Sequence, residues 1–142
     1  MTTILADFRL GVMVADSSIS DGDRVWIGRK VYRYKGSIIG FSGEVDESIE
    51  FMRWWRRGCG TKPPKFSHSN ALVLSESGLL HFASSCTGIP VESGIEAIGS
   101  GGKAAICTYE AMGFTDPVAA VKLVCKHDAG SRTPVRTYRM KP

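Results

Sequence analysis

The sequence lacks any long hydrophobic run, and this absence excludes one class of protein. No apolar stretch in its 142 residues approaches the roughly 20 residues that a membrane-spanning helix requires. The first residues, Met1-Thr2-Thr3-Ile4, also lack the basic segment and the apolar core of a secretory signal. We therefore expect neither a signal peptide nor a membrane partner.

Cysteine and histidine are scarce, and neither is spaced for a metal site or a disulfide framework. The cysteines form no CxxC pair, and the three histidines show no ligand spacing. We therefore expect no metal, no cofactor and a reducing, cytoplasmic location. The cysteines are Cys59, Cys86, Cys107 and Cys125, of which the last two fall in alanine-rich helical stretches and are expected to be small core residues.

Charge is also modest, with a formal net charge of +4. A hydrophobic content of 43% and a charged content of 23% are ordinary for a globular protein, so we expect residues 1–142 to form one domain with a real core. Two groups of basic residues stand out, at Arg53, Arg56, Arg57, Lys62 and Lys65, and at Arg132, Arg136, Arg139 and Lys141. We interpret both groups as solvated faces, and nucleic-acid binding is the less favoured alternative.

The first 43 residues are rich in strand-forming residues. Turns near Leu10-Gly11 and Lys35-Gly36 predict four short strands in two hairpins, separated by a longer loop from Ser17 to Gly28. Residues 44–57 then change to a helical period, with Ser48, Phe51, Met52 and Trp55 on one face. Trp54 falls off this stripe, which predicts a partly buried surface tryptophan or a residue of a subunit interface.

The remaining elements are predicted from turns and caps. After a loop at 58–65, residues 71–75 and 79–82 form a hairpin, and residues 94–98 are extended. Two helices follow, one from 101 to 112 and one that begins at Pro117 with Asp116 as its N-cap and ends near Lys126. The segment 135–139 returns to strand.

Thr2 gains a chemical meaning if Met1 is removed, which a small second residue permits. It would then carry a hydroxyl and a free α-amine, and an α-amine titrates near pH 8, so part of it could accept the hydroxyl proton at neutral pH. On these residues alone, an ordinary strand threonine is the simpler interpretation.

Five motifs follow one another along the chain. They are Thr2-Thr3-Ile4 at the start, Ala15-Asp16-Ser17 before a loop, Lys30 at the opening of the next strand, Gly40-Phe41-Ser42-Gly43 ahead of a helix, and Ala97-Ile98-Gly99-Ser100-Gly101-Gly102. Two further segments follow them, His127-Asp128-Ala129-Gly130-Ser131 and Val135-Arg136-Thr137-Tyr138. In this order they resemble the threonine peptidases of the proteasome β-subunit and HslV type, within the N-terminal nucleophile hydrolases. The resemblance covers nearly the whole chain except residues 58–70, where those proteins have a second long helix. It implies an α+β fold, a four-layer αββα sandwich of two mostly antiparallel sheets between helices, here with a shortened helical middle.

The resemblance also implies roles for individual residues. Thr2 would attack the scissile carbonyl, Lys30 would lower the pKa of its hydroxyl, and Asp16 would keep Lys30 charged and oriented. The backbone amide of Gly43 would stabilise the oxyanion. The remaining roles are a hydrogen bond near the threonine amine for Ser100, orientation of that amine for Asp128 and Ser131, and substrate contacts for Ser20 and for Phe41, whose ring would make an apolar floor.

Each role has a plainer alternative. Asp16 and Lys30 could form an ion pair between neighbouring strands, Ser100 could cap a helix, and Asp128 could open a turn. Gly99 to Ala104 also fits a dinucleotide-binding GxGxxA pattern, but too little chain follows for the further parallel strands, and the expected acid about twenty residues on is missing.

We therefore predict an N-terminal threonine endopeptidase that hydrolyses polypeptide substrates through an acyl-enzyme after loss of Met1. The resemblance implies a homo-oligomeric ring and a separate ATP-dependent unfoldase, although the shortened middle leaves the ring size open. The alternative is a catalytically inactive structural or regulatory subunit of the same fold.

Overall fold

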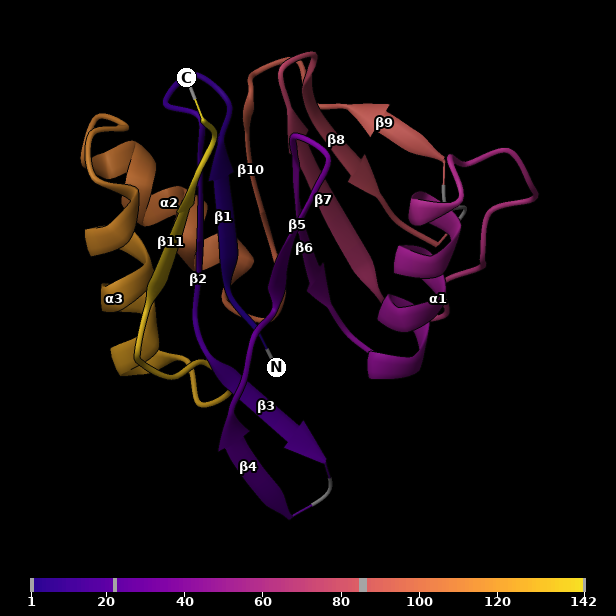
Figure 1. Ribbon diagram of the computed structural model, residues 1–142. Coiled ribbons are helices and arrows are strands. Elements are labelled where there is room, and N and C mark those ends of the chain that lie inside the picture. Colours follow the sequence, from indigo (N-terminus) through magenta and orange to yellow (C-terminus); the bar gives the residue numbers. More distant parts are fainter. Residues whose placement is uncertain (1, 22, 85–86, 142) are drawn as a thin grey trace.

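The chain folds into two stacked antiparallel sheets with helices on both outer faces, which confirms the predicted α+β sandwich (Figure 1). The computed structural model describes residues 2–21, 23–84 and 87–141. The first sheet has the strand order β10-β1-β2-β11, formed by Ile95–Ile98, Ile4–Asp7, Val12–Ala15 and Arg136–Arg139. The second has the order β5-β6-β7-β8-β9, formed by Val31–Tyr34, Ser37–Ser42, Asn70–Ser75, Gly78–Phe82 and Gly88–Pro90.

Strand β1 is buried on both faces because it lies between the second sheet and a helical layer. Ile4 and Ala6 belong to the core between the two sheets, and Leu5, which points the opposite way, belongs to the core under the helices. In β2, Met13 and Val14 divide between the two cores in the same way. The strand that follows Thr2 is therefore fixed by packing on both sides.

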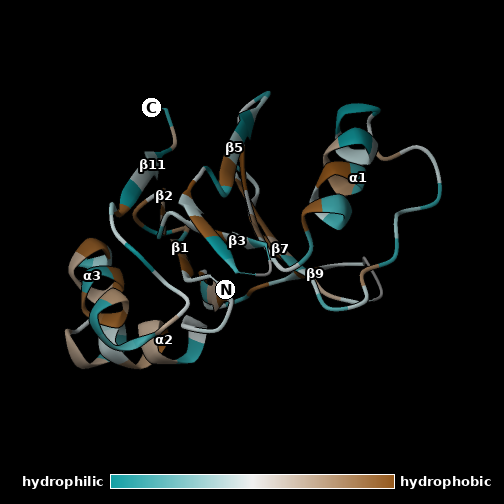
Figure 2. Cartoon of the chain, turned by 90° about the horizontal axis from the view of Figure 1, so that it is seen from below, coloured by the Kyte–Doolittle hydropathy of each residue, from teal (hydrophilic) through white to brown (hydrophobic). Residues whose placement is uncertain are grey.

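The three helices lie on opposite sides of the sandwich (Figure 2). Helices α2 (Gly102–Ala111) and α3 (Pro117–His127) cover the four-stranded sheet, and α1 (Val45–Arg56) covers the five-stranded sheet. The start of α3 is as predicted, because the Asp116 side chain accepts a hydrogen bond from the Ala119 amide at 2.9 Å. No helix in the described parts of the chain is long and apolar enough to cross a membrane.

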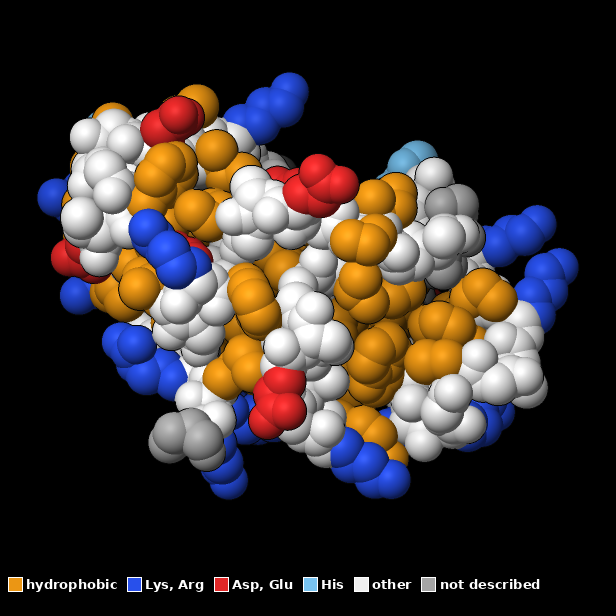
Figure 3. Space-filling model, turned by 90° about the horizontal axis from the view of Figure 1, so that it is seen from above, with side chains coloured by type: hydrophobic (Ala, Val, Ile, Leu, Met, Phe, Trp, Pro, Cys, Tyr) orange, Lys and Arg blue, Asp and Glu red, His pale blue; other side chains and the backbone are white. Residues whose placement is uncertain are grey.

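An aromatic core fills the space between α1 and its sheet. Phe51 is fully buried, and its ring centroid lies 5.0–6.0 Å from those of Phe41, Trp54, Trp55, Phe66 and Phe82. The margin of this core remains partly open, and on the face seen from above hydrophobic side chains are visible with Lys and Arg side chains around the rim (Figure 3). Within the described residues, α1 alone covers the outer face of the five-stranded sheet.

The prediction for Trp54 was wrong. Its side chain is buried, and its Nε1 donates a hydrogen bond to the Thr61 carbonyl at 3.0 Å. The loop after α1 therefore folds back onto this indole, so the helix buries Phe51, Met52 and Trp54, while Trp55 is only half-buried.

Two further expectations need correction. The segment 17–28 is not an open loop, because β3 (Ser18–Asp21) and β4 (Arg24–Ile27) pair into a two-stranded ribbon that forms a third, small sheet. Cys107 is exposed rather than in the core, because α2 turns Ala105 and Tyr109 inward; Cys125 is half-buried, and Cys86 lies outside the described residues.

Candidate active site

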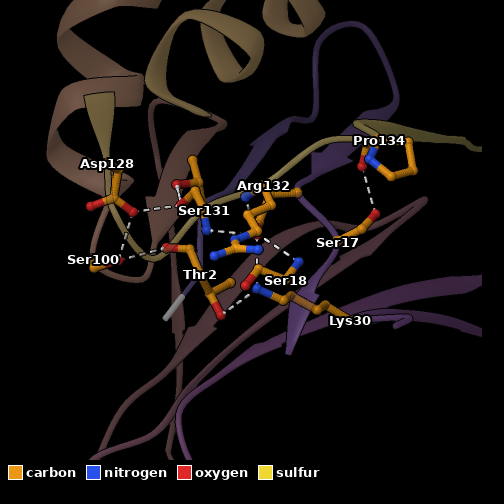
Figure 4. Close-up of polar contacts among 11 residues, drawn as sticks. Thr2, Ser17, Ser18, Lys30, Ser100, Asp128, Ser131, Arg132 and Pro134 are labelled. Carbon is orange, nitrogen blue, oxygen red and sulfur yellow. Dashed lines mark hydrogen bonds and ion pairs between the residues drawn. The ribbon is translucent and has the colours of Figure 1, made fainter. Parts of the chain in front are cut away.

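Three polar side chains meet at the end of the sandwich where β1 begins. Thr2 precedes β1, Asp16 follows β2, and Lys30 precedes β5. The Lys30 ammonium donates to the Thr2 hydroxyl oxygen at 2.9 Å and to Asp16 Oδ1 at 2.9 Å (Figure 4). All three residues are buried, with exposed fractions of 5%, 1% and 8% respectively.

Asp16 is held by the backbone as well as by Lys30. Its Oδ1 accepts from the Thr3 amide at 3.0 Å, and its Oδ2 accepts from the amides of Ser18 at 3.1 Å and Arg132 at 3.0 Å. Together with the lysine, these donors occupy both oxygens of the carboxylate twice. The aspartate therefore has a fixed orientation, and so does the ammonium group that it binds.

The environment of Lys30 changes its acidity. Burial lowers the pKa of the Lys30 ammonium below its usual value of 10.5, and the charge of Asp16 and its hydrogen bond oppose this effect only in part. A buried ammonium beside a hydroxyl favours the alkoxide form of that hydroxyl and disfavours a second positive charge nearby.

Ser100, Asp128 and Ser131 form a chain of hydrogen bonds next to this group (Figure 4). Asp128 Oδ2 accepts from Ser100 Oγ at 2.9 Å and from Ser131 Oγ at 2.6 Å. At one end Ser100 makes a long contact of 3.5 Å to the Thr2 carbonyl oxygen, and at the other Ser131 Oγ lies 2.6 Å from Thr3 Oγ1. The three predicted residues are thus brought together, but in the described structure their contacts are to the Thr2 carbonyl and to Thr3 rather than to the Thr2 amine.

Backbone contacts that the sequence analysis missed hold Thr2 in place. The Gly101 amide donates to the Thr2 carbonyl at 3.1 Å. Gly99 has a φ of +93°, and a β-carbon there would collide with the same carbonyl, so only glycine allows this approach. The glycines between 99 and 102 therefore bring the start of α2 against the N-terminal segment. The spacing of these glycines in the sequence was the signal from which this close contact could have been predicted.

A groove of about 910 Å³ opens beside Thr2 and Lys30. One wall comes from the β3–β4 ribbon and includes Ser20, and the other comes from the end of β6 and the start of α1 and includes Phe41 and Gly43. Phe41 is only 7% exposed, and its ring packs on Phe51 with centroids 5.3 Å apart. Ser20 and Phe41, the two predicted substrate contacts, and Gly43, the predicted oxyanion donor, thus line one groove with Thr2.

Within the described residues, no group of three or more His, Cys, Asp or Glu side chains is placed to hold a metal ion. The chemistry that the site can support on its own side chains is nucleophilic: a hydroxyl and a neighbouring ammonium that line the groove, with a fixed carboxylate buried behind them. Met1 lies outside the described residues, so its removal stays a prediction.

Comparison with known proteins gives a result for the fold alone. No family model and no curated protein sequence matches the chain. Solved structures do match. The eukaryotic HslV from Trypanosoma brucei superposes with a TM-score of 0.78 at 22% identity, over 96% of this chain and 98% of that one.

Two other structures match at lower sequence identity. BPH from Thiobacillus denitrificans, in complex with epoxomicin, has a TM-score of 0.71 at 16% identity over the full length of both chains. Anbu, an ancestral beta-subunit from Yersinia bercovieri, has a TM-score of 0.74 at 10% identity over 99% of this chain and 81% of that one. The chain therefore has the fold that HslV, BPH and Anbu share, as the resemblance in its sequence predicts.

Proposed function

We propose that this protein is an N-terminal threonine endopeptidase that hydrolyses peptide bonds through a covalent Thr2 ester after Met1 is removed. One observation carries the proposal: the Lys30 ammonium lies 2.9 Å from both the Thr2 hydroxyl and the Asp16 carboxylate, in a buried site that borders a groove. A plain ion pair between strands would not need the hydroxyl, and it would not need the groove.

The proposed reaction uses groups of this chain only. The Thr2 oxygen forms a bond to the scissile carbonyl carbon, the hydroxyl proton passes to the Thr2 α-amine, and the carbonyl π-electrons move onto oxygen. Lys30 stabilises the attacking oxygen, and the Gly43 amide donates to the oxyanion. Collapse of this intermediate breaks the C–N bond, and the leaving amine takes the proton from the α-ammonium. Water then hydrolyses the ester with the α-amine as base, and Thr2 is restored.

The groove supports the assignment of a polypeptide substrate. The groove of about 910 Å³ has room for an extended peptide segment, with Ser20 at one wall and Phe41 at the other. We propose that Ser100, Asp128 and Ser131 orient the N-terminal residues through their shared hydrogen bonds. By analogy with the family that the sequence resembles, we also propose a cytoplasmic homo-oligomeric ring of this single domain, supplied with unfolded polypeptide by a separate ATPase.

The first test is the mass of the purified protein combined with its activity on peptides. Active protein should lack one methionine, and protein that retains Met1 should cleave fluorogenic peptides no faster than the buffer. Thr2→Ala should abolish cleavage, and Thr2→Ser, which keeps a hydroxyl and an amine, should retain part of it. Cleavage unchanged by Thr2→Ala would contradict the proposal.

A covalent probe makes the second test independent of any substrate preference. A peptide α′,β′-epoxyketone forms a ring adduct only with a residue that carries both a hydroxyl and a free amine. We expect one such adduct, mapped to Thr2 by mass spectrometry of the N-terminal peptide. A correctly trimmed and folded protein that forms no adduct and cleaves no peptide would instead support the inactive structural subunit.

A further inference from the structure

The start of α1 is held by an arrangement that differs from an ordinary helix cap. Glu44 is the N-cap residue, and its own side chain makes no capping hydrogen bond. Its backbone amide donates instead to Ser69 Oγ at 2.9 Å, and Ser69 Oγ donates to Glu47 Oε1 at 2.6 Å. Ser69 precedes β7, so this contact joins two segments more than twenty residues apart.

The geometry is that of a capping box with a hydroxyl inserted. In a capping box, the side chain of the third helical residue reaches back to the amide of the N-cap residue. Glu47 is the third residue of α1, but it reaches the Glu44 amide through Ser69. Its second oxygen accepts from the Ser67 amide at 2.7 Å. One carboxylate thus fixes both the first turn of the helix and the end of the loop that returns from it.

This arrangement also sets the position of Gly43. Gly43 has a φ of +115°, and a β-carbon on it would meet the Cα of Ser69 at 2.6 Å and the Ser69 hydroxyl at a shorter distance still. Ser69 is 4% exposed, so it cannot move into solvent without breaking the contacts just described. Gly43 therefore packs directly against Ser69. The Gly43–Glu44 peptide is fixed as well, because the Glu44 amide donates to Ser69 Oγ.

We propose that Glu47 and Ser69 are positioning residues that fix the Gly43 amide as the oxyanion donor on the groove wall formed by the end of β6 and the start of α1. This inference rests on the proposed peptidase function, because it assigns to the two residues a part in that same site. Neither side chain needs to touch the substrate. Ser69 acts through the Gly43–Glu44 peptide, and Glu47 acts through Ser69.

The protonation state of Glu47 agrees with this role. Partial burial acts to raise the pKa of its carboxyl, but hydrogen bonds from Ser69, from the Ser67 and His68 amides and from the Ser67 hydroxyl outweigh it, and the pKa lies below the usual value of 4.5. Glu47 is therefore an ionised acceptor at neutral pH, which is the form that Ser69 requires when it donates to it.

The test is Ser69→Ala in protein that has lost Met1. We expect kcat for peptide hydrolysis to fall by about ten- to a hundredfold with KM nearly unchanged, because a misplaced oxyanion donor affects the transition state and not the ground state. Affinity for a peptide aldehyde, which adds to the Thr2 hydroxyl and places an oxygen at the oxyanion position, should fall by a similar factor. Affinity for the matching peptide alcohol, which cannot form this bond, should stay the same.

Two further variants complete the experiment. Ser67→Ala is the matched control, since the Ser67 hydroxyl contacts Glu47 only at 3.3 Å and does not contact Glu44; its kcat should stay within about twofold of wild type. Glu47→Gln keeps an acceptor for Ser69 but removes the charge, and it should give a loss intermediate between Ser67→Ala and Ser69→Ala. If Ser69→Ala does not fold, the kcat of Glu47→Gln tests the positioning role instead.

The outcomes separate this inference from the proposed function. Wild-type kcat and aldehyde affinity in Ser69→Ala, or equal weakening of aldehyde and alcohol, would overturn the positioning role while the peptidase assignment stands. If Ser69→Ala does not fold, wild-type kcat in Glu47→Gln overturns it. A trimmed wild-type protein that neither cleaves peptides nor prefers aldehyde over alcohol would overturn both.

Discussion

Two carboxylates organise two parts of the groove, the catalytic group at Thr2 and the wall that includes Gly43, and they do so from opposite environments. The Asp16 side chain is fully buried between β1, β2 and the segment before β11, and it contacts Lys30 directly. Glu47 is half-buried on the first turn of α1, and it reaches the groove only through Ser69. The catalytic group at Thr2 is thus fixed by the sandwich, whereas the groove wall that includes Gly43 is fixed by a loop that closes onto a helix.

This difference predicts two kinds of failure. Damage to the Asp16 side should reduce folding stability and activity together, because the same contacts serve both. Damage to the Glu47 side should reduce activity with a smaller effect on stability.

Asp16→Ala should give the largest effect. It removes the acceptor of Lys30 and of three backbone amides, so a buried charge loses its partner, and we expect about 3–5 kcal/mol of destabilisation. Peptide hydrolysis should fall by at least about a hundredfold, because the ammonium loses its orientation. Urea unfolding measures the first quantity. Asp23→Ala, on the exposed turn of the ribbon, is the control and should stay within about 0.5 kcal/mol of wild type. Equal stability of the two variants would contradict the comparison.

Gly43→Ala should come next and should affect the groove wall that Glu47 and Ser69 hold. The substitution places a β-carbon against Ser69 in a left-handed conformation, and we expect about 1–3 kcal/mol of destabilisation together with a fall in kcat. Gly78→Ala is a matched control, because Gly78 also has a positive φ, of +137°, but no atom lies within 4 Å of the added carbon. The control should lose stability from backbone strain alone and keep its kcat. An equal fall in kcat for both would show that Ser69 does not position Gly43.

The pH dependence should report on Lys30 separately. Since catalysis requires the charged ammonium and burial lowers its pKa, the rate should decline on the alkaline side at a pH below 10.5. Between the lowered pKa and 10.5 the unfolded chain binds more protons than the folded one, so the free energy of unfolding should rise with pH across this window. Lys30→Met should lose this contribution, as measured by urea unfolding at several pH values. The same slope in both proteins would exclude Lys30 as its source.

Glu47→Gln should give the smallest effect on stability, and it should appear in an acidic pH window rather than an alkaline one. The lowered pKa of Glu47 means that its hydrogen bonds stabilise the folded state above pH 4.5 and are lost as the pH falls through the folded-state value. The difference in stability between wild type and Glu47→Gln should therefore shrink below pH 4.5. Glu50→Gln, which breaks only an exposed pair with Arg53, is the control and should show a smaller difference at neutral pH.

The positions of the main elements could be predicted because their signals are local. The hairpin at 70–82 and both C-terminal helices follow from turn residues, an Asp-Pro start and periodicity. The proximity of Thr2, Asp16 and Lys30 also followed, since each lies next to the end of a short strand and the order resembles a known family.

What the sequence could not predict depends on contacts between distant segments. Trp54 is buried because the loop after α1 returns to cover it, and the helical periodicity of the sequence does not predict where that loop packs. The hydrogen bonds between Glu47 and Ser69 join residues 22 positions apart for the same reason. The β3–β4 ribbon was different, since a Gly-Asp pair at 22–23 between two strand-forming runs is a local hairpin signal in the sequence.

The pairing of β2 with β11 has a practical consequence for handling the protein. Arg136 lies opposite Ala15, at the Thr2 end of the sheet, and Arg139 lies opposite Val12, at the far end of β2. Strand β11 therefore leads away from the site, and the two termini lie well apart (Figure 1). Residues 139–141 are therefore the suitable point of attachment for an affinity tag, a fluorophore or a surface anchor. A fusion before Thr2 would consume the α-amine, and it would need a protease that leaves threonine first.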